Sequence, residues 1–83
     1  EDVAAQTHQV FKNLSAIAKA SGGNLVNIVK MTIYLTDLNS FSIVNEIMAS
    51  YFQEPYPARA TIEVSALPKK ALIEVEAILA LEI

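Results

Sequence analysis

The first part of the chain has the pattern of an amphipathic helix. Between Val3 and Ala20, apolar or small side chains recur every three or four positions, and charged and amide side chains lie between them. The stripe consists of Val3, Thr7, Val10, Phe11, Leu14, Ile17 and Ala18. Gly22 and Gly23 follow directly, and glycine favours the left-handed conformation in which many helices end. We therefore expect one helix over residues 3–20 with a single buried face.

The hydrophobic period changes to two residues in the next segment. Apolar and polar side chains alternate over residues 29–36, and the β-branched and aromatic content is typical of a strand with one face on a core. The apolar positions are Val29, Met31, Ile33 and Leu35. Turn-forming residues at 37, 39 and 40 then end the strand. The helical period returns over residues 42–52, which predicts a second helix whose buried face consists of Ile43, Val44, Ile47, Met48, Tyr51 and Phe52.

Two further strands are expected in the last third of the chain. Pro55 and Pro57 stop the second helix, because each proline restricts the residue before it to an extended conformation. A short strand over residues 59–64 alternates between Ala60, Ile62 and Val64 on one face and Arg59, Thr61 and Glu63 on the other. After a connector over residues 66–70, a last strand over residues 72–81 places Glu74 and Glu76 opposite an apolar face of Ile73, Val75, Ala77, Leu79 and Leu81.

This order of elements predicts an α+β fold. The sequence has 83 residues, enough for one small domain over residues 1–83. A helix, a strand, a second helix and two strands make a layer in which two helices pack on one face of a mixed β-sheet. Three strands form a thin sheet for two helices, and the chain starts on a helical pattern with Glu1 rather than Met. We therefore expect an N-terminally incomplete domain, whose sheet is completed by earlier strands or by a partner chain.

Composition narrows the functional classes. Hydrophobic residues make up 53% of the chain, more than the ~45–50% of ordinary soluble domains, and this excess predicts apolar surface buried against other chains. No apolar run approaches the ~20 residues that span a bilayer. No cysteine is present for a disulfide or a thiolate site, and the single His8 cannot make a zinc site alone. The net charge of −3 argues against a nucleic-acid partner. Without a targeting pattern, a cytoplasmic location is the default expectation.

Arg59 is the first candidate for chemistry. It is the only arginine, and it begins a short strand behind two prolines that stiffen its approach. A planar guanidinium presents a rigid pair of donors that matches a carboxylate, which lysine cannot imitate. The alternative is a structural ion pair with Glu63, Glu74 or Glu76, and from the residues alone this alternative is favoured.

Glu74 and Glu76 are the second candidates. They lie in the middle of the most apolar strand, where a carboxylate is costly unless it is paired or exposed. One of them could orient a water molecule or act as a general base. The alternative, again favoured by the residues alone, is that this face of the sheet is solvated or forms a polar subunit interface. His8 is expected to be an exposed residue of the first helix.

A run of motifs carries a family resemblance. Residues 57–64 read Pro-Ala-Arg-Ala-Thr-Ile-Glu-Val, and they are followed by Leu67-Pro68 and by Ile-Glu-Val-Glu-Ala over residues 73–77. These motifs resemble the signature of the RidA family, also called YjgF. Similar blocks occur at residues 6–14, 28–38 and 41–45, so that the resemblance covers essentially the whole chain. The one departure in the signature is Val75, where the family usually has Met or Ile.

The resemblance implies an activity and an assembly. RidA proteins have a chorismate-mutase-like subunit, form homotrimers with active sites in clefts between subunits, and use no metal or organic cofactor. They hydrolyse reactive 2-imino acids, such as 2-iminobutanoate and 2-iminopropanoate, to 2-keto acids and ammonia. Pyridoxal-phosphate enzymes such as threonine dehydratase release these imines. The expected partners are therefore small 2-imino and 2-keto acids and further copies of the chain, with neither a membrane nor a nucleic acid.

The resemblance also assigns the site residues. Arg59 matches the arginine that holds the substrate carboxylate in a two-pronged salt bridge, and Glu74 matches the acidic residue that positions the attacking water. Thr61 falls where many members have a cysteine whose backbone carbonyl holds the imine nitrogen. The remaining pocket elements of the family, a tyrosine and a Ser-Gly turn, belong to N-terminal strands outside this sequence. The expected site therefore has Glu74 as its catalytic residue and Arg59 and Thr61 as substrate-binding residues.

Two other functions stay open. A ligand-binding or regulatory trimer without turnover would need the same carboxylate clamp as the deaminase. Members of the family have also been described as endoribonucleases and translation inhibitors. The acidic balance makes this third function the weakest, because affinity for RNA depends on neutralising its phosphates.

Overall fold

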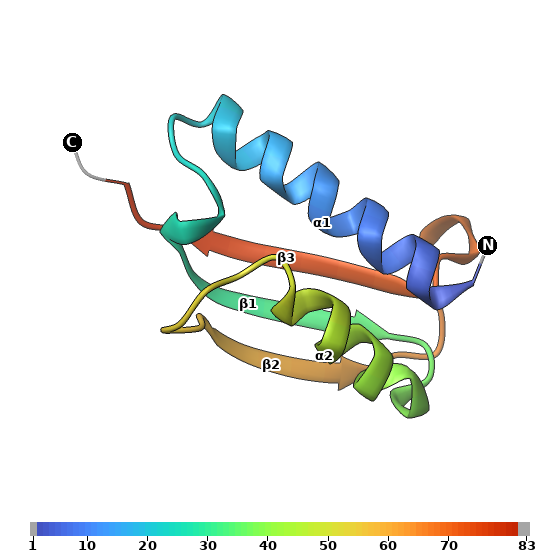
Figure 1. The fold of residues 1–83 in the computed structure, drawn as a ribbon. Coiled ribbons are helices and arrows are strands. Elements are labelled where there is room, and N and C mark those ends of the chain that lie inside the picture. Colours follow the sequence, from blue (N-terminus) through green and yellow to red (C-terminus); the bar gives the residue numbers. More distant parts are fainter. Residues whose placement is uncertain (1, 82–83) are drawn as a thin grey trace.

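The computed structural model describes residues 2–81 of the chain. Along the sequence it contains α1 (Val3–Ala20), β1 (Ile28–Leu35), α2 (Phe41–Ala49), β2 (Ala58–Glu63) and β3 (Ile73–Leu79). Short 3₁₀ turns precede β1, α2 and β3 (Figure 1). No helix in this part of the chain is long and apolar enough to cross a membrane.

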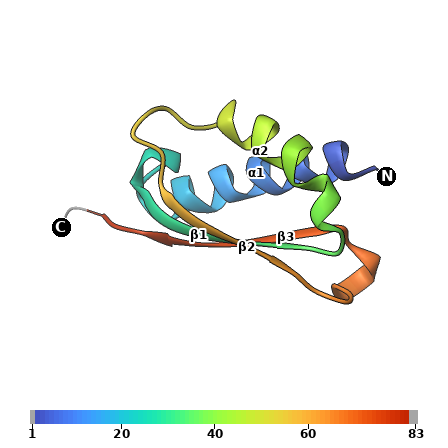
Figure 2. The ribbon, with the colours of Figure 1, turned by 90° about the horizontal axis from the view of Figure 1, so that it is seen from below.

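The strands form one mixed sheet with β1 at its centre. The order is β2-β1-β3, and β1 runs parallel to β2 and antiparallel to β3. Both helices lie on the same face of the sheet, α1 over its β3 side and α2 over its β2 side (Figures 1 and 2). No described element covers the other face, which we call the open face. The predicted α+β architecture, with two helices on one face of a mixed sheet, is confirmed.

The core lies between the two helices and the inner face of the sheet. Met31, Ile33 and Leu35 occupy alternate positions of β1, and each is at most 1% exposed, as the two-residue period predicts. The helices close the core with aromatic and aliphatic side chains. The hydrophobic core cluster of the described residues consists of Phe11, Ile28, Met31, Ile33, Leu35, Val44, Met48 and Ile73.

The ends of α1 follow from local capping. Asp2 Oδ1 accepts a hydrogen bond from the Ala5 N–H at 2.8 Å, which satisfies one of the donors that every helix N-terminus leaves unpaired. At the other end, Gly22 has a φ of 95°, in the left-handed region expected of a C-terminal glycine. The predicted bounds of this helix are confirmed. Ile17 departs from the predicted stripe, because it lies at the β3 edge of the sheet, where its side chain is 61% exposed.

The predicted alternation is wrong at the start of β1. Val29 is 50% exposed, whereas Ile28 is 4% exposed and belongs to the core. The ladder with β3 shifts its register between Ile28 and Lys30. Such an irregularity inserts a residue into one strand, so the side chains that precede it change face.

α2 ends at Ala49, three residues before the predicted end at Phe52. The apolar pattern continues beyond the helix because Tyr51 and Phe52 still pack on Phe11, with ring centroids 5.5 and 6.0 Å away. The helical spacing of apolar residues therefore identifies buried side chains in this segment, although Tyr51 and Phe52 lie beyond the end of the helix.

Candidate functional site

Arg59 faces the helix layer although it lies on an outer strand. In the parallel ladder, Arg59 stands opposite Met31 and Thr61 stands opposite Ile33. Residues opposite each other share a face of the sheet, and Met31 and Ile33 are buried under the helices. The polar face of β2 therefore points toward α2. Its apolar face points away, and Ile62 is 45% exposed on the open face of the sheet.

The guanidinium of Arg59 contacts two side chains of α2. Its Nη1 lies 3.9 Å from Met48 Sδ, and its Cζ lies 5.7 Å from the centroid of the Phe41 ring. Within residues 2–81, Arg59 forms no salt bridge with a carboxylate. The structural ion pair that the residues alone favoured is therefore not formed within the described chain.

A cavity of about 250 Å³ opens beside this guanidinium. Its lining consists of Met31, Asn45, Met48, Ala49, Tyr56, Pro57 and Arg59. The Oδ1 atom of Asn45 is buried and has no hydrogen-bond partner, although buried polar atoms are nearly always paired. Asn45 was not predicted as a site residue, because an amide among the apolar positions of a helix is common. Only its unpaired oxygen, seen in three dimensions, identifies it.

The chemistry of this cavity fits a small carboxylate. Arg59, which forms no salt bridge within residues 2–81, supplies a clamp for the acid group, and the Asn45 amide adds a polar side chain to the lining. The other walls are thioether, methyl and aromatic groups, which suit a short apolar side chain. A volume of about 250 Å³ lies below the ~300–1,000 Å³ of sites for drug-sized ligands. The ligand must therefore be small.

Thr61 lies near this cavity without lining it. Its side chain is half-buried and shares the helix-facing side of β2 with Arg59. The lining of the cavity reaches β2 at Arg59 and does not include Thr61. A role for the Thr61 backbone in substrate binding therefore stays a prediction.

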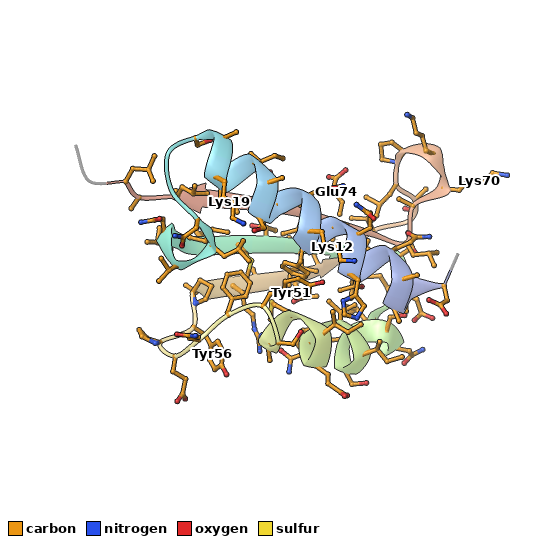
Figure 3. All side chains as sticks on the ribbon, turned by 45° about the horizontal axis from the view of Figure 1, so that its top comes forward. Lys12, Lys19, Tyr51, Tyr56, Lys70 and Glu74 are labelled. Atoms are coloured by element: carbon orange, nitrogen blue, oxygen red, sulfur yellow. The ribbon has the colours of Figure 1, made fainter. Side chains whose placement is uncertain are left out.

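The structure does not bring Glu74 to Arg59 within one chain. Glu74 stands opposite Tyr34 in the ladder between β1 and β3, on the open face, and its side chain is exposed. Two strand spacings of ~4.8 Å and three residue rises of ~3.3 Å separate the Cα atoms of Arg59 and Glu74 by about 14 Å. Figure 3 shows Glu74 on the β3 side of the molecule and Tyr56, which lines the cavity, on the other side.

The open face around Glu74 is polar. Tyr34 donates a hydrogen bond from its hydroxyl to Glu76 Oε1 at 2.7 Å. This hydrogen bond, followed by desolvation and by the negative charges of Glu76 and Glu74, raises the pKa of Tyr34 above its ordinary value. Ile62 and Ile78 add exposed apolar surface to the same face. The combination agrees with the alternative of a solvated face or a polar subunit interface.

His8, the remaining titratable residue considered above, contacts Tyr51. His8 is an exposed residue of α1, as predicted, and its Nδ1 lies 2.8 Å from the Tyr51 hydroxyl. Among residues 2–81, no group of three or more His, Asp or Glu side chains could hold a metal ion.

Comparison with known proteins shows the family. The family model described as Endoribonuclease L-PSP matches residues 1–81. The chain belongs to this family. A RutC family protein of Pyrococcus horikoshii is 51% identical over 77 residues, which are 93% of this chain and 61% of the relative. A 2-iminobutanoate/2-iminopropanoate deaminase of Rattus norvegicus is 51% identical over 76 residues, which are 92% of this chain and 56% of the relative. The chain thus spans only about three fifths of the length of these curated relatives.

Solved structures of the family have the same fold. RidA from the Antarctic bacterium Psychrobacter sp. PAMC 21119 superposes with a TM-score of 0.96 at 47% identity, over 98% of this chain and 66% of that one. TdcF of E. coli with bound serine superposes with a TM-score of 0.93 at 38% identity, over 99% of this chain and 67% of that one. The resemblance to the RidA (YjgF) family and the predicted fold class are therefore confirmed.

Proposed function

We propose that the protein hydrolyses small 2-imino acids to 2-keto acids and ammonia. The carrying observation is that Arg59 lines a small cavity together with Asn45 and forms no salt bridge within residues 2–81. Relatives that carry the name 2-iminobutanoate/2-iminopropanoate deaminase support the reaction. Other members of the family are named endoribonucleases, so the family alone does not select between these activities.

The chemistry follows from the groups in the cavity. Arg59 holds the substrate carboxylate through two parallel hydrogen bonds, and Asn45 Oδ1 accepts a hydrogen bond from the imine N–H once the amide turns this buried oxygen toward the cavity. A water oxygen bonds to the imine carbon, the electron pair of the C=N bond moves to nitrogen, and nitrogen gains a proton. The hydroxyl proton of this adduct then passes to nitrogen and the carbon–nitrogen bond breaks, which releases ammonia and leaves the keto group. Orientation of the carbon beside a fixed water contributes several kcal/mol by making the encounter effectively unimolecular.

Glu74 is the proposed general base, and a neighbouring copy of the chain supplies it. The base must lie within hydrogen-bond reach of the water that it deprotonates. Within one chain, Glu74 is on the opposite face of the sheet from Arg59 and about 14 Å away. A homotrimer that packs the open face of one copy against the β2 side of the next would bring the two residues together. The exposed Ile62 and Ile78 on the open face support such an interface.

An assay with freshly made imine tests this function. The protein is added to a reaction in which threonine dehydratase releases 2-iminobutanoate, and the appearance of 2-ketobutanoate is followed. We expect the protein to accelerate it and Arg59→Ala to abolish the gain. Lys12→Ala is the matched control, because it removes an exposed cation from α1, outside the cavity. An intact protein that gives no acceleration contradicts the proposal.

A second candidate is a trimer that binds small carboxylates without turnover. It is favoured by one observation: Arg59 and Asn45 line one cavity within a single chain, whereas Glu74 is not among its lining residues. The serine bound in the related TdcF is a small amino acid, which suits such a clamp. Calorimetric binding of 2-ketobutanoate together with an inactive imine assay would select this candidate.

Ribonuclease activity is the least supported by the residues. The net charge is −3, and the chain has only six Lys and Arg in total, whereas an RNA-binding surface gathers basic side chains. Binding of RNA that weakens steeply with salt would reverse this order. The cytoplasmic location, like the homotrimer, stays a prediction.

A further inference from the structure

Two side chains of α2 hold the Arg59 guanidinium from the helix side. Phe41 lies beneath Cζ with a centroid distance of 5.7 Å, and Met48 Sδ is 3.9 Å from Nη1. Phe41 and Met48 are separated by two turns of the same helix, so they lie on one face of α2. The cation is therefore bracketed by a single rigid element.

Neither contact neutralises the cation. An aromatic face attracts a guanidinium through its quadrupole, and a thioether sulfur is a weak hydrogen-bond acceptor. A carboxylate in the same place would bind the guanidinium more strongly and would compete with a carboxylate ligand. No carboxylate within residues 2–81 takes that place. The arrangement restrains the guanidinium while most of its five N–H donors stay available.

We propose that Phe41 and Met48 are positioning residues that orient Arg59 for a bound carboxylate. This inference rests on the proposed function, because it assigns the same carboxylate ligand to the Arg59 cavity. A guanidinium that is already held in the free protein loses less side-chain freedom when the ligand binds. Removal of either contact should weaken substrate and transition state alike, which raises KM and leaves kcat unchanged.

Loss of position must be separated from loss of stability. Met48 is 4% exposed, and Phe41 packs against the core, so both residues also support the fold. A merely structural role lowers the folded fraction and hence the apparent kcat, but it leaves KM unchanged. Phe52 provides a matched control, because it is a partly buried phenylalanine that packs edge-on against Phe11 and does not line the Arg59 cavity.

The test uses variants of the intact protein. Phe41→Leu, Met48→Leu and the double variant that carries both changes are compared with the control Phe52→Leu. The first measurement is the NMR order parameter of the Arg59 Nε–H bond without ligand. The second is KM for 2-iminobutanoate, with the Kd of 2-ketobutanoate from calorimetry. We expect the order parameter to fall in the first three variants and not in Phe52→Leu. KM and Kd should rise about two- to fivefold for Phe41→Leu. Phe41→Tyr, which keeps the ring, should have the KM and Kd of the wild type.

Each outcome decides the inference. An unchanged order parameter in the double variant overturns it, whatever the activity of the protein. A lower order parameter with unchanged KM and Kd also overturns it, and so does a wild-type protein that binds no 2-ketobutanoate. A wild-type protein that binds 2-ketobutanoate without hydrolysing imines contradicts the deaminase, whereas Kd values that follow the order parameter still support the positioning role.

Discussion

Asn45 and Arg59 line the same cavity; within residues 2–81, the buried Oδ1 atom of Asn45 has no hydrogen-bond partner and Arg59 forms no salt bridge. An unpaired buried oxygen costs about 1–3 kcal/mol of stability. A ligand that carries both a carboxylate and an adjacent N–H group would satisfy the two residues together once the Asn45 side chain turns its oxygen toward the cavity. The cost is therefore explained if the cavity is a binding site for an amino or imino acid.

A role of Asn45 in ligand binding predicts that Asn45→Ala makes the protein more stable but weakens ligand binding. Asn45→Ala removes the unpaired oxygen and introduces the best helix former, so the free energy of unfolding should rise by about 1 kcal/mol in urea titrations. The Kd of 2-aminobutanoate, which carries N–H donors, should rise about three- to tenfold. The Kd of 2-ketobutanoate, which lacks them, should stay the same. A variant that binds both ligands as the wild type does would contradict a role for Asn45 in the site.

The sequence predicts the features that local interactions determine, and it does not predict those that depend on contacts between distant segments. α1 and the alternation of β3 were predictable because helix ends and periodicity depend on local interactions. Asp2 caps the start of α1, and Gly22 follows its end. The face of β2 that is covered was not predictable. Only its register against β1, which places Arg59 opposite Met31, turns its polar face toward the helices.

The candidate site depends even more on distant contacts. Arg59 was recognisable because it is the only arginine within a family motif. Asn45 acquires its meaning only when α2 and β2 enclose a cavity. The placement of Arg59 and Glu74 on opposite faces of the sheet could not be read from the motif, because a linear motif does not specify which face each strand presents.

Glu63 is expected to fix β2 relative to α2. Its Oε1 accepts a hydrogen bond from the Leu38 N–H at 2.8 Å, in the turn that leads into α2. Glu63→Ala should lower the free energy of unfolding by about 1 kcal/mol, as measured by urea titration. Glu46→Ala, at an exposed position of α2, is the control and should stay within about 0.5 kcal/mol of the wild type. Equal stabilities of the two variants would argue against the tether.

We expect the folded protein to lose stability at alkaline pH because of the raised pKa of Tyr34. Its pKa is raised in the folded protein by the hydrogen bond to Glu76, by desolvation and by the nearby carboxylates. The native state therefore retains the phenol proton where the unfolded chain, with a tyrosine pKa of ~10, releases it. This contribution is fully present below pH ~10 and is lost as the pH rises through the folded pKa.

Two variants check this behaviour. Tyr34→Phe should flatten the alkaline decrease in the free energy of unfolding, because the titrating group is gone. Glu76→Ala removes both the hydrogen-bond acceptor and its charge, and should lower the Tyr34 pKa toward its ordinary value in an ultraviolet difference titration. A Tyr34 pKa that does not change in Glu76→Ala would show that Glu76 is not its cause.

The proposed catalytic site takes Arg59 from one copy and Glu74 from another, and subunit mixing tests this most directly. Arg59→Ala and Glu74→Gln proteins, each expected to be inactive toward 2-iminobutanoate, are unfolded, mixed in equal amounts and refolded together. If each site takes its two residues from different copies, random assembly gives about one quarter of the sites both residues, and activity should return to about that fraction of the wild type. A mixed preparation with no more activity than its two parents would contradict a shared site.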